Sequence, residues 1–428
     1  MSGTKHSGWV PRLRFPEFGD AEGWTPDAGA SLFDQVNDRD PGPGLPVLAI
    51  TQEHGAIPRH MIDYHVSVSE KSIESYKVVR VGDFIISLRS FQGGIEYSRY
   101  HGICSPAYVI LRRHGEGSDE YFRHYLKTDR FIRILTKNLE GLRDGKMISY
   151  SQFSGLMLPV PTPAEQQKIA DCLSSLDDLI TLEAQKLDGL KAHKKGLMQQ
   201  LFPREGETQP RLRFPEFKNA GEWARMSIQE MIDRQFIVGH LDGNHGELYP
   251  KAEDFSQNKE GIPYITANDF MNGSVDFSRC KRLPIERARL FKKGVAKDGD
   301  ILFAHNATVG PVAKLNTSED FVVLSTTATY FRCNSTHLSN DFLKSALSSP
   351  DFVAQYSRVM SQSTRNQVPI TTQRKLDLHI PLLPEQQRLA SCLSSLDTLI
   401  TLETQKLEAL KTHKKGLMQQ LFPQVPEE

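Results

Sequence analysis

The stretch that decides the fold occurs twice in this chain. Residues 168–203 read KIADCLSSLDDLITLEAQKLDGLKAHKKGLMQQLFP, and residues 388–423 read RLASCLSSLDTLITLETQKLEALKTHKKGLMQQLFP. Shorter matches surround these copies: RLRFPEF at 12–18 returns at 211–217, and GDFI at 82–85 returns as GDIL at 299–302. Internal repetition fixes the architecture before any secondary structure is considered. The chain is therefore a tandem duplication.

The similarity between the two copies is uneven. Residues 19–161 and 218–381 share a skeleton but few surface residues, whereas the tails that follow them are nearly identical. Neutral drift after a recent duplication would not leave one segment nearly identical while another diverges. We therefore predict two domains with different surfaces, each followed by the same long helix. Residues 19–161 are called reader 1 and residues 218–381 are called reader 2.

Length and composition agree with more than one folded part. The chain has 428 residues, 39% of them hydrophobic, whereas a single core rarely grows beyond about 250–300 residues. Short strands are expected after the Gly-Asp turns at 82–83 and 299–300, and a helix over 121–139, so the expected fold class is α+β. The expected order is an N-terminal segment (1–18), reader 1 (19–161), a first helix (162–203), a linker (204–217), reader 2 (218–381), a second helix (382–423) and a tail (424–428).

Each repeated tail predicts one long helix. Thr162, Pro163 and Glu165 match a capping box with proline at the first helical position, so the first helix should start near Pro163. Leu382 replaces the threonine in the second copy, so that cap should be weaker. With Pro203 as a stop, a length of roughly 30–39 residues corresponds to about 45–58 Å. The apolar residues form a heptad seam: Ile169, Leu173, Leu176, Ile180, Leu187, Leu190, Leu197 and Leu201.

A helix of that length with one leucine stripe needs a partner along it. We expect the partner to be its own copy, packed antiparallel as a coiled coil with pseudo-twofold symmetry, which would hold one reader at each end. The alternative is that each helix packs back on its own reader.

Two seam positions in each helix carry a charge where heptad counting expects leucine. They are Glu183 and Lys194 in the first helix, and Glu403 and Lys414 in the second. An antiparallel register that places Glu183 opposite Lys414 also places Lys194 opposite Glu403. Breaking a buried pair costs roughly 3–5 kcal/mol, so we expect these charges to specify the register. The competing interpretation is that they point to water.

The overall charge argues against indiscriminate attraction of polyanions, because 52 basic residues balance 52 acidic ones. The five cysteines are scattered and never spaced as CxxC, which argues against a disulfide framework or a zinc site and fits a reducing cytoplasm. The N-terminus lacks an apolar signal segment, and no run of about 18 apolar residues occurs, so we expect a soluble cytoplasmic protein.

Side chains with paired donors, or with a donor and an acceptor, read bases in the major groove, chiefly Arg for guanine and Asn or Gln for adenine. In reader 1 such residues follow the strand at 78–87 and occupy the connection at 143–149. In reader 2 they occupy the aligned loops after 301–304 and at 364–367, with different chemistry, as domains that read different half-sites should. The candidates are Arg89, Gln92, Arg143, Lys146, His305, Asn306, Thr308, Arg365, Asn366 and Gln367.

Two basic stretches are candidates for phosphate contact. Residues 279–297 hold eight Lys or Arg against the single acid Glu286, and the predicted helix at 121–139 carries basic residues on one face. A solvated charged surface is the alternative for both. The candidates are Arg123, Lys127, Arg130, Arg279, Lys281, Arg282, Arg289, Lys292 and Lys293.

No catalytic motif accompanies these loops. The sequence lacks N-P-P-[YF] and D-P-P-[YF] runs for positioning an adenine amino group, a Gly-rich nucleotide-binding turn and a GxxxxGK[ST] loop. The histidines and carboxylates show no HExxH or comparable spacing, so we expect no metal site. Asp83 and Asp300 follow glycine before a strand, which is typical of a turn. We expect no catalysis and no cofactor in this chain.

Two divergent domains, each followed by a helix that opens with EQQ (165–167, 385–387) and closes with HKKGLMQQLFP (193–203, 413–423), resemble the specificity subunit of type I restriction-modification enzymes over essentially the whole chain. The resemblance implies target-recognition domains separated by a helical spacer, a bipartite double-stranded DNA target, and assembly with two methyltransferase subunits, which two restriction-translocase subunits can join. It also implies that S-adenosylmethionine, and ATP with magnesium, belong to the partner subunits. It transfers no base-contacting residue.

Two other classes stay open at this point. A coiled-coil scaffold without DNA specificity would show no sequence-dependent binding when methyltransferase and random competitor DNA are present. An autonomous methyltransferase or nuclease would require activity from the purified chain, and the missing motifs oppose it.

Overall fold

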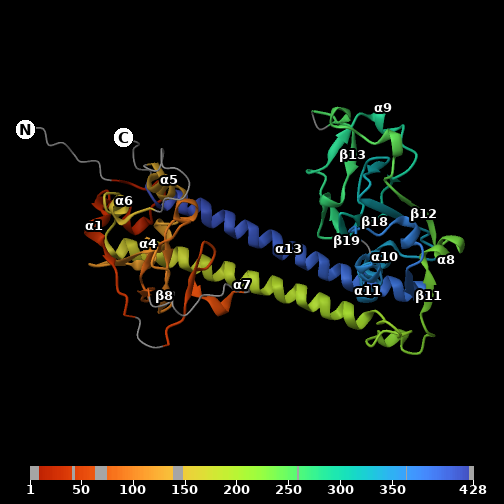
Figure 1. The fold of residues 1–428 in the computed structure, drawn as a ribbon, viewed down its shortest axis with the longest axis horizontal. Helices are drawn as coiled ribbons and strands as arrows, with labels where there is room; N and C mark the ends of the chain where they lie inside the picture. Colours follow the sequence, from red (N-terminus) through yellow and green to blue (C-terminus); the bar gives the residue numbers. More distant parts are fainter. Residues whose placement is uncertain are drawn as a thin grey trace, which may run out of the picture. The chain divides into compact units, whose positions relative to one another are not determined.

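The computed structural model describes residues 9–40, 44–62, 75–137, 148–257, 260–362 and 364–423. The chain divides into two compact units: unit 1 is Met1–Glu183 with Lys406–Glu428, and unit 2 is Ala184–Gln405. Two long helices, α7 (Pro163–Leu201) and α13 (Leu383–Leu421), each contribute one half to each unit (Figure 1). The expected mixed fold class is confirmed.

Reader 1 in unit 1 is built on a four-stranded antiparallel sheet in the order β2, β9, β6, β7, with three two-stranded sheets beside it (β1 with β10, β3 with β4, β5 with β8). Its strands are β1 (Thr25–Ala28), β2 (Phe33–Val36), β3 (Leu48–Thr51), β4 (Gly55–Pro58), β5 (Lys77–Val79), β6 (Phe84–Ile86), β7 (Glu96–Tyr97), β8 (Gly102–Cys104), β9 (Val109–Arg113) and β10 (Met157–Val160). Its helices are α1 (Gly29–Leu32), α3 (Ser90–Gly93), α4 (Asp119–Tyr125), α5 (Asp129–Lys137) and α6 (Tyr150–Ser154).

Reader 2 in unit 2 has a larger sheet in the order β12, β21, β18, β19, β15, β14, a four-stranded sheet in the order β16, β13, β20, β17, and the pair β11 with β22. Its strands are β11 (Ala224–Ser227), β12 (Ile237–Asp242), β13 (Ile262–Ile265), β14 (Phe270–Met271), β15 (Ser274–Val275), β16 (Lys281–Leu283), β17 (Val295–Ala296), β18 (Ile301–Asn306), β19 (Thr308–Lys314), β20 (Val322–Leu324), β21 (Ala328–Cys333) and β22 (Asp377–Ile380). Its helices are α8 (Ile228–Asp233), α9 (Ile285–Ala288), α10 (Asn340–Ala346), α11 (Pro350–Ser361) and α12 (Ile370–Gln373).

The Gly-Asp turns have the structural role that the sequence indicates. Gly82 adopts a φ of 96°, in the region that favours glycine. The buried Asp83 carboxylate accepts a hydrogen bond from the Arg80 N–H at 2.7 Å and two from the Arg112 guanidinium. Asp300 repeats this arrangement in reader 2 with Arg332. These carboxylates therefore fix a turn at the start of a central strand.

The helix predicted over 121–139 is two helices, α4 and α5, so that expectation was wrong in its continuity. The Thr128 hydroxyl accepts a hydrogen bond from the Phe131 N–H at 3.2 Å and so starts a new helix. The apolar stripe continues across the break because Phe122, Phe131 and Leu135 are buried in one core.

The core of reader 1 includes the ends of both long helices. Ile169 and Leu173 of α7 are buried there, together with Leu421 at the end of α13 and Phe422, which follows it. The Phe422 ring centroid lies 5.5 Å from that of Tyr121. The apolar start and the LFP end of the repeated tail therefore serve reader packing.

The core of reader 2 is assembled in the same way from the opposite helix ends. Leu201 at the end of α7 and Phe202, which follows it, are buried with Leu389 and Leu393 of α13. The Phe202 ring stacks on Phe342 with 5.9 Å between centroids. The helices thus pack on each other, as expected, and their ends also pack on the readers, which was the alternative.

The RLRFPEF repeat fastens each unit at both helices, and we call this arrangement the clasp. In unit 1 the Arg14 guanidinium donates two hydrogen bonds of 2.8 Å to Glu165 near the start of α7. The Leu13 N–H donates to the Gln420 carbonyl near the end of α13 at 3.0 Å. The Thr162 hydroxyl accepts the Glu165 N–H at 3.4 Å, as the cap predicts, but the Glu165 carboxylate binds Arg14 and does not close the box.

Unit 2 repeats the clasp with its own copies of these residues. Arg213 donates two hydrogen bonds of 2.7 Å to Glu385 near the start of α13. The Leu212 N–H donates to the Gln200 carbonyl near the end of α7 at 2.9 Å. Both carboxylates are almost completely buried, so each clasp holds a charge that needs its partner.

The halves of α7 and α13 pair antiparallel in each unit, but the predicted register was wrong. In unit 1 Glu183 pairs with Lys406, and Lys414 pairs with Asp177. In unit 2 Lys194 pairs with Asp397 and Glu403 with Lys186. The observed stagger differs from the predicted one by about one heptad, which leaves a leucine seam intact. The clasps and the buried helix ends hold the observed register, because in each unit they contact the start of one helix and the end of the other.

The helices of the described ranges include none that combines the length and the apolar character needed to cross a bilayer.

Candidate nucleic-acid interface

Each reader is held on the helices by the same polar contacts. The Ser118 N–H donates to the Gln166 side chain at 2.9 Å, and the Ser339 N–H to Gln386 at 3.0 Å. These glutamines are the middle residues of the two EQQ motifs. In each motif the glutamate therefore binds the arginine of the clasp, and the first glutamine binds the backbone of the reader. The attachment of a reader is therefore a repeated, fixed part of the molecule.

A second repeated contact ties a cation of the reader to an aspartate of a helix. In unit 1 Asp177 of α7 binds Arg123 of α4 at 3.1 Å and also Lys414. In unit 2 Asp397 of α13 binds Lys344 of α10 at 3.4 Å and also Lys194.

The unit 1 network contains a buried histidine, His124, which lies 3.2 Å from the Ser174 hydroxyl. Burial, together with the nearby Arg123 and Lys414 cations, lowers the pKa of His124 to about 2. The ring therefore stays neutral at physiological pH.

Two predicted base-reading residues of reader 1, Arg89 and Gln92, lie together on an exposed tip formed by residues 87–94, between β6 and β7. Ser90, in the middle of this tip, is buried and accepts the Ser87 N–H at 2.8 Å. The two predicted side chains are thus presented from a hydrogen-bonded support. The other predicted pair, Arg143 and Lys146, lies outside the described residues.

Sequence reasoning missed two residues of the same tip. Leu88 and Phe91 leave 53% and 43% of their surface exposed beside Arg89 and Gln92. The available signal was the presence of two large apolar residues in an otherwise polar loop, which favours a contact surface over a solvated turn.

In reader 2 the two predicted loops form a single tip. Asn306 of β18 pairs with Gln367 in a β-bridge, and the Ala307 N–H donates to the Asn366 carbonyl at 3.0 Å. Ala307 has a φ of 63°, which turns the chain between β18 and β19. Thr308 is exposed beside it, as are Arg365 and Asn366 in the second loop.

The side chains of this tip differ in how many of their hydrogen-bonding groups are available to a ligand. The Asn366 amide donates to the Ala307 carbonyl at 3.3 Å, which leaves its own carbonyl oxygen and one N–H for a base. Asn306 is half-buried, with a long contact of 3.5 Å to the Thr326 carbonyl. Their roles as base readers stay predictions.

His305 was predicted as a base reader, but the structure buries it. Only 6% of His305 is exposed. It lies in β18, where the five residues Ile301–His305 are all buried. Its place behind the tip is that of a packing residue, so we withdraw it as a direct base contact.

Two of the three phosphate candidates of reader 1 form ion pairs within the protein. Arg123 binds Glu120 and Asp177, and Lys127 forms an ion pair with the buried Glu96. Burial lowers the pKa of Lys127 and raises that of Glu96, while each charge opposes the shift of the other. Arg130 is half-buried on α5. The structure therefore argues against Arg123 and Lys127 as phosphate contacts.

The phosphate candidates of reader 2 fall into two groups. Arg282 binds Glu319 at 3.1 Å, and Lys281 lies over the Phe255 ring at 5.0 Å. Arg279 is exposed and contacts the Met271 sulfur. The second group follows α9 and consists of exposed residues, Arg289, Lys292 and Lys293. Arg279 and Lys281 are exposed as well, but Arg282 is half-buried in its ion pair, so the second group is the one in which every member is exposed and is the better candidate for a phosphate-binding surface.

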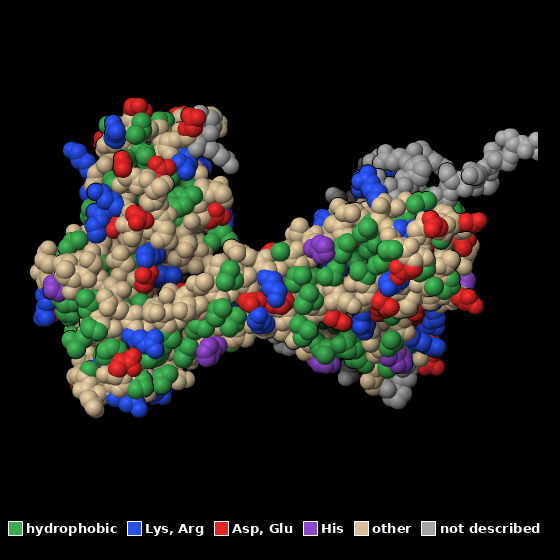
Figure 2. All heavy atoms as spheres, turned by 180° about the vertical axis from the view of Figure 1, so that it is seen from behind, with side chains coloured by type: hydrophobic (Ala, Val, Ile, Leu, Met, Phe, Trp, Pro, Cys, Tyr) green, Lys and Arg blue, Asp and Glu red, His purple; other side chains and the backbone are tan. Residues whose placement is uncertain are grey.

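Basic and acidic side chains are interspersed on the face of each unit that Figure 2 shows. This agrees with the balance of 52 basic and 52 acidic residues. DNA attraction by either reader would thus come from local groups of cations and would be sensitive to salt.

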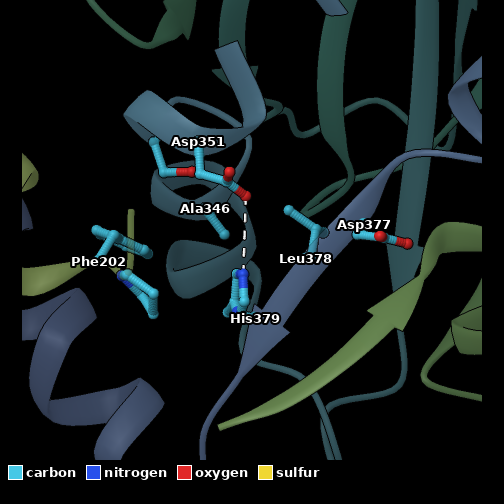
Figure 3. Close-up of a pocket in the computed structure, with 8 residues that line it drawn as sticks. Phe202, Ala346, Asp351, Asp377, Leu378 and His379 are labelled. Carbon is cyan, nitrogen blue, oxygen red and sulfur yellow. Dashed lines mark ion pairs between the residues drawn. The ribbon is translucent and has the colours of Figure 1, made fainter. Parts of the chain in front are cut away.

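A small pocket in unit 2 lies away from the tips, between α10, α11 and β22, next to the end of α7 (Figure 3). It is lined by Phe202, Ala346, Leu378 and the pair His379–Asp351, whose N···O distance is 3.8 Å. Its free volume of about 10 Å³ holds at most one water. Such a pocket cannot hold a nucleotide cofactor. Within the described ranges no three His, Cys, Asp or Glu side chains gather as a metal site.

Two α+β domains with exposed tips of different chemistry, each attached to the helices by the same polar contacts, define a protein with two separate recognition domains. The profile of the type I restriction modification DNA specificity domain matches residues 32–192 and 238–412. The chain belongs to this family and carries two copies of its domain, as a specificity subunit does.

Relatives agree with this assignment over most of the chain. The chain is 24% identical over 364 residues to the type I restriction enzyme MjaVIII specificity subunit of Methanocaldococcus jannaschii, covering 83% of this chain and 81% of that protein. It is 22% identical to the putative MjaX specificity subunit of the same organism, covering 89% and 86%. The fold is similar to a crystal structure of the type I S subunit from M. genitalium, with a TM-score of 0.57, 15% identity, and coverage of 97% and 100%.

Proposed function

We propose that this subunit chooses the DNA sequence on which a type I restriction-modification complex acts, with each reader recognising one half of a bipartite duplex target. The observation that carries the proposal is the contrast between repeated attachment and divergent tips. Arg89, Leu88 and Phe91 occupy the tip of reader 1, whereas Asn366 and Thr308 occupy the tip of reader 2. Two different base-reading surfaces on one repeated support fit two different half-sites.

The helices serve as the spacer and as the docking surface for two methyltransferase subunits. Leu182 of α7 leaves 62% of its surface exposed in unit 1, and the equivalent Leu402 of α13 leaves 55% exposed in unit 2. Leu179 and Leu399, one turn earlier in each helix, are exposed as well. A duplicated apolar pair supports two equivalent docking sites for one kind of partner. Two restriction-translocase subunits join that assembly.

In this proposal the chain contributes recognition and no catalytic group. S-adenosylmethionine belongs to the methyltransferase partners, and ATP with magnesium belongs to the translocase partners. The assembly acts in the cytoplasm, where it meets double-stranded DNA.

A competition binding assay tests this function. In the presence of random competitor DNA, the full chain with its methyltransferase partner should bind a duplex that carries the methylated motif and retard its migration in a gel. A duplex with a scrambled motif should migrate as free DNA. Equal binding to both duplexes would support the scaffold alternative.

The mass of the purified complex tests the docking surface, because it gives the number of methyltransferase subunits bound. Leu182→Lys should reduce the methyltransferase content from two subunits to one, and Leu182→Lys with Leu402→Lys should remove both. Lys411→Ala, at an exposed helical position outside these pairs, serves as the control.

A further inference from the structure

The tip of reader 1 carries more apolar surface than a hydrogen-bonding loop needs. Leu88 is 53% exposed and Phe91 is 43% exposed, on either side of the buried Ser90. Between and beside them stand Arg89 and Gln92, whose side chains are exposed. Four neighbouring side chains of the tip, two apolar and two polar, therefore face solvent together.

The backbone of this tip is held rigidly. The Arg89 N–H donates to the Ser87 hydroxyl at 3.2 Å, and the Gly94 N–H donates to the Ser90 carbonyl at 2.9 Å. Gly94 has a φ of 80°, and a Cβ there would lie 2.2 Å from the Leu126 carbonyl oxygen. These contacts fix the backbone positions from which Leu88 and Phe91 project.

The neighbouring segment also fixes the tip. The Ile95 N–H donates to the Leu126 carbonyl at 3.2 Å, and Gln52 contacts the tip through a 3.4 Å hydrogen bond to the Arg89 carbonyl. The apolar side chains are thus preorganised toward an external surface, and any contact they make in a complex requires little ordering of the protein.

The chemistry of the tip matches one feature of duplex DNA. In the major groove an A·T pair presents the thymine 5-methyl group beside the adenine N6 and N7 edge. A phenylalanine contacts that methyl, while a glutamine pairs with the adenine edge and an arginine with a neighbouring guanine. Phe91, Gln92 and Arg89 supply these three groups within four residues.

We infer that Phe91, assisted by Leu88, packs against a thymine 5-methyl group, so that the half-site read by reader 1 contains an A·T pair recognised through this methyl. The inference rests on the proposed function and extends it by naming a specificity-determining residue and its target group. Reader 2 has Thr308 at the position aligned with Phe91, and the buried His305 at that of Leu88. Because a threonine methyl can also contact a thymine 5-methyl group, the contact is assigned to reader 1 by the loss of the uracil effect in Phe91→Ala, as described below.

The test replaces each thymine of the methylated motif by uracil, which removes only the 5-methyl group. The full chain with its methyltransferase partner binds each duplex in the presence of competitor DNA. One uracil in one half-site should weaken binding about fourfold, the effect of losing one buried methyl contact. Phe91→Ala should weaken binding to the thymine duplex by a similar factor and should be insensitive to that uracil, whereas Phe91→Leu should retain sensitivity.

Val81→Ala is the matched control, because Val81 is 63% exposed in the turn at the other end of β6. It should leave the uracil effect unchanged. A half-site without any A·T pair, or a Phe91→Ala variant that weakens the thymine and uracil duplexes equally, would overturn the inference. The second result would instead indicate a wedge between base steps. Loss of all sequence preference in the wild-type complex would contradict the proposed function itself, so the two failures are distinguishable.

Discussion

The attachment of the readers and the tips of the readers differ in how far the two units agree. Arg14 with Glu165 in unit 1 corresponds to Arg213 with Glu385 in unit 2, with the same bidentate geometry. At the tips, by contrast, Phe91 corresponds to Thr308. Buried charges permit little change because each needs its partner, whereas exposed side chains can vary without a cost in stability. The molecule therefore separates a fixed support from a variable reading surface.

The largest effect should come from breaking a clasp. Arg213→Ala leaves the buried Glu385 carboxylate without a counter-ion, with the Trp223 indole N–H at 3.3 Å still donating to it, and should lower the free energy of unfolding by roughly 3–5 kcal/mol. Arg14→Ala should act similarly through Glu165. Denaturant unfolding measures the loss, and Arg211→Ala, which removes a solvent-exposed ion pair, is the control with little expected effect. An Arg213→Ala variant as stable as the control would show that the clasp does not support the fold.

The attachment in unit 1 should also depend on pH through His124. The folded state keeps this ring neutral down to a pKa of about 2, whereas the unfolded ring takes a proton near its ordinary value of 6.5. The stability from the neutral ring is therefore present above pH 6.5 and is lost as the pH falls below it, by about 2 kcal/mol at pH 5. His124→Gln should flatten the stability profile between pH 7 and 5, and the exposed His54→Gln should not. Parallel profiles for wild type and His124→Gln would contradict this assignment.

The tips should respond to substitution one half-site at a time. Asn366→Ala should relax specificity only in the half read by reader 2, and Arg89→Ala only in the other, each by about tenfold, within the 1–3 kcal/mol of a bidentate base contact. Each variant is the control for the other. Sequencing of the methylated motif measures both, and an unchanged motif with Asn366→Ala would remove that residue from the reading surface.

The smallest and least selective effect should come from the basic group after α9. Arg289→Ala with Lys292→Ala should weaken binding to all duplexes alike and reduce the salt slope by about two, because phosphate contacts carry no sequence information. The exposed Lys218→Ala should leave the slope unchanged. A change in the recognised motif would mean that these residues read bases.

Much of the support could be predicted from the sequence, because periodicity and capping are local. The heptad stripe and Pro163 predicted α7 with its correct start. The pairing of Glu183 with Lys406 could not be predicted, because a shift by one heptad again places apolar positions opposite one another, and the clasps that hold the observed register join residues distant in sequence. The role of the RLRFPEF repeat could not be predicted either, because Arg14 binds Glu165, a residue far from it in sequence.

The positions of the tips could be predicted from the sequence, but which of their side chains are exposed could be predicted only in part. Repeat alignment found Arg89 and Asn366 on exposed loops, but residue type alone did not indicate that His305 is buried. Arg123 and Lys127 had the right charge for phosphate, yet tertiary contacts supply them with carboxylates. The exposure of Phe91 depends on the backbone of its tip, which no periodic pattern describes.

The central claim is that two different readers on one repeated support recognise two separate half-sites. Methylation-sensitive sequencing of DNA from cells that express this chain with its methyltransferase partner tests it most directly. The account predicts a split motif, with two short specified halves of different sequence around an unspecified gap of fixed length. A continuous motif, or two halves separated by a gap of variable length, would contradict it.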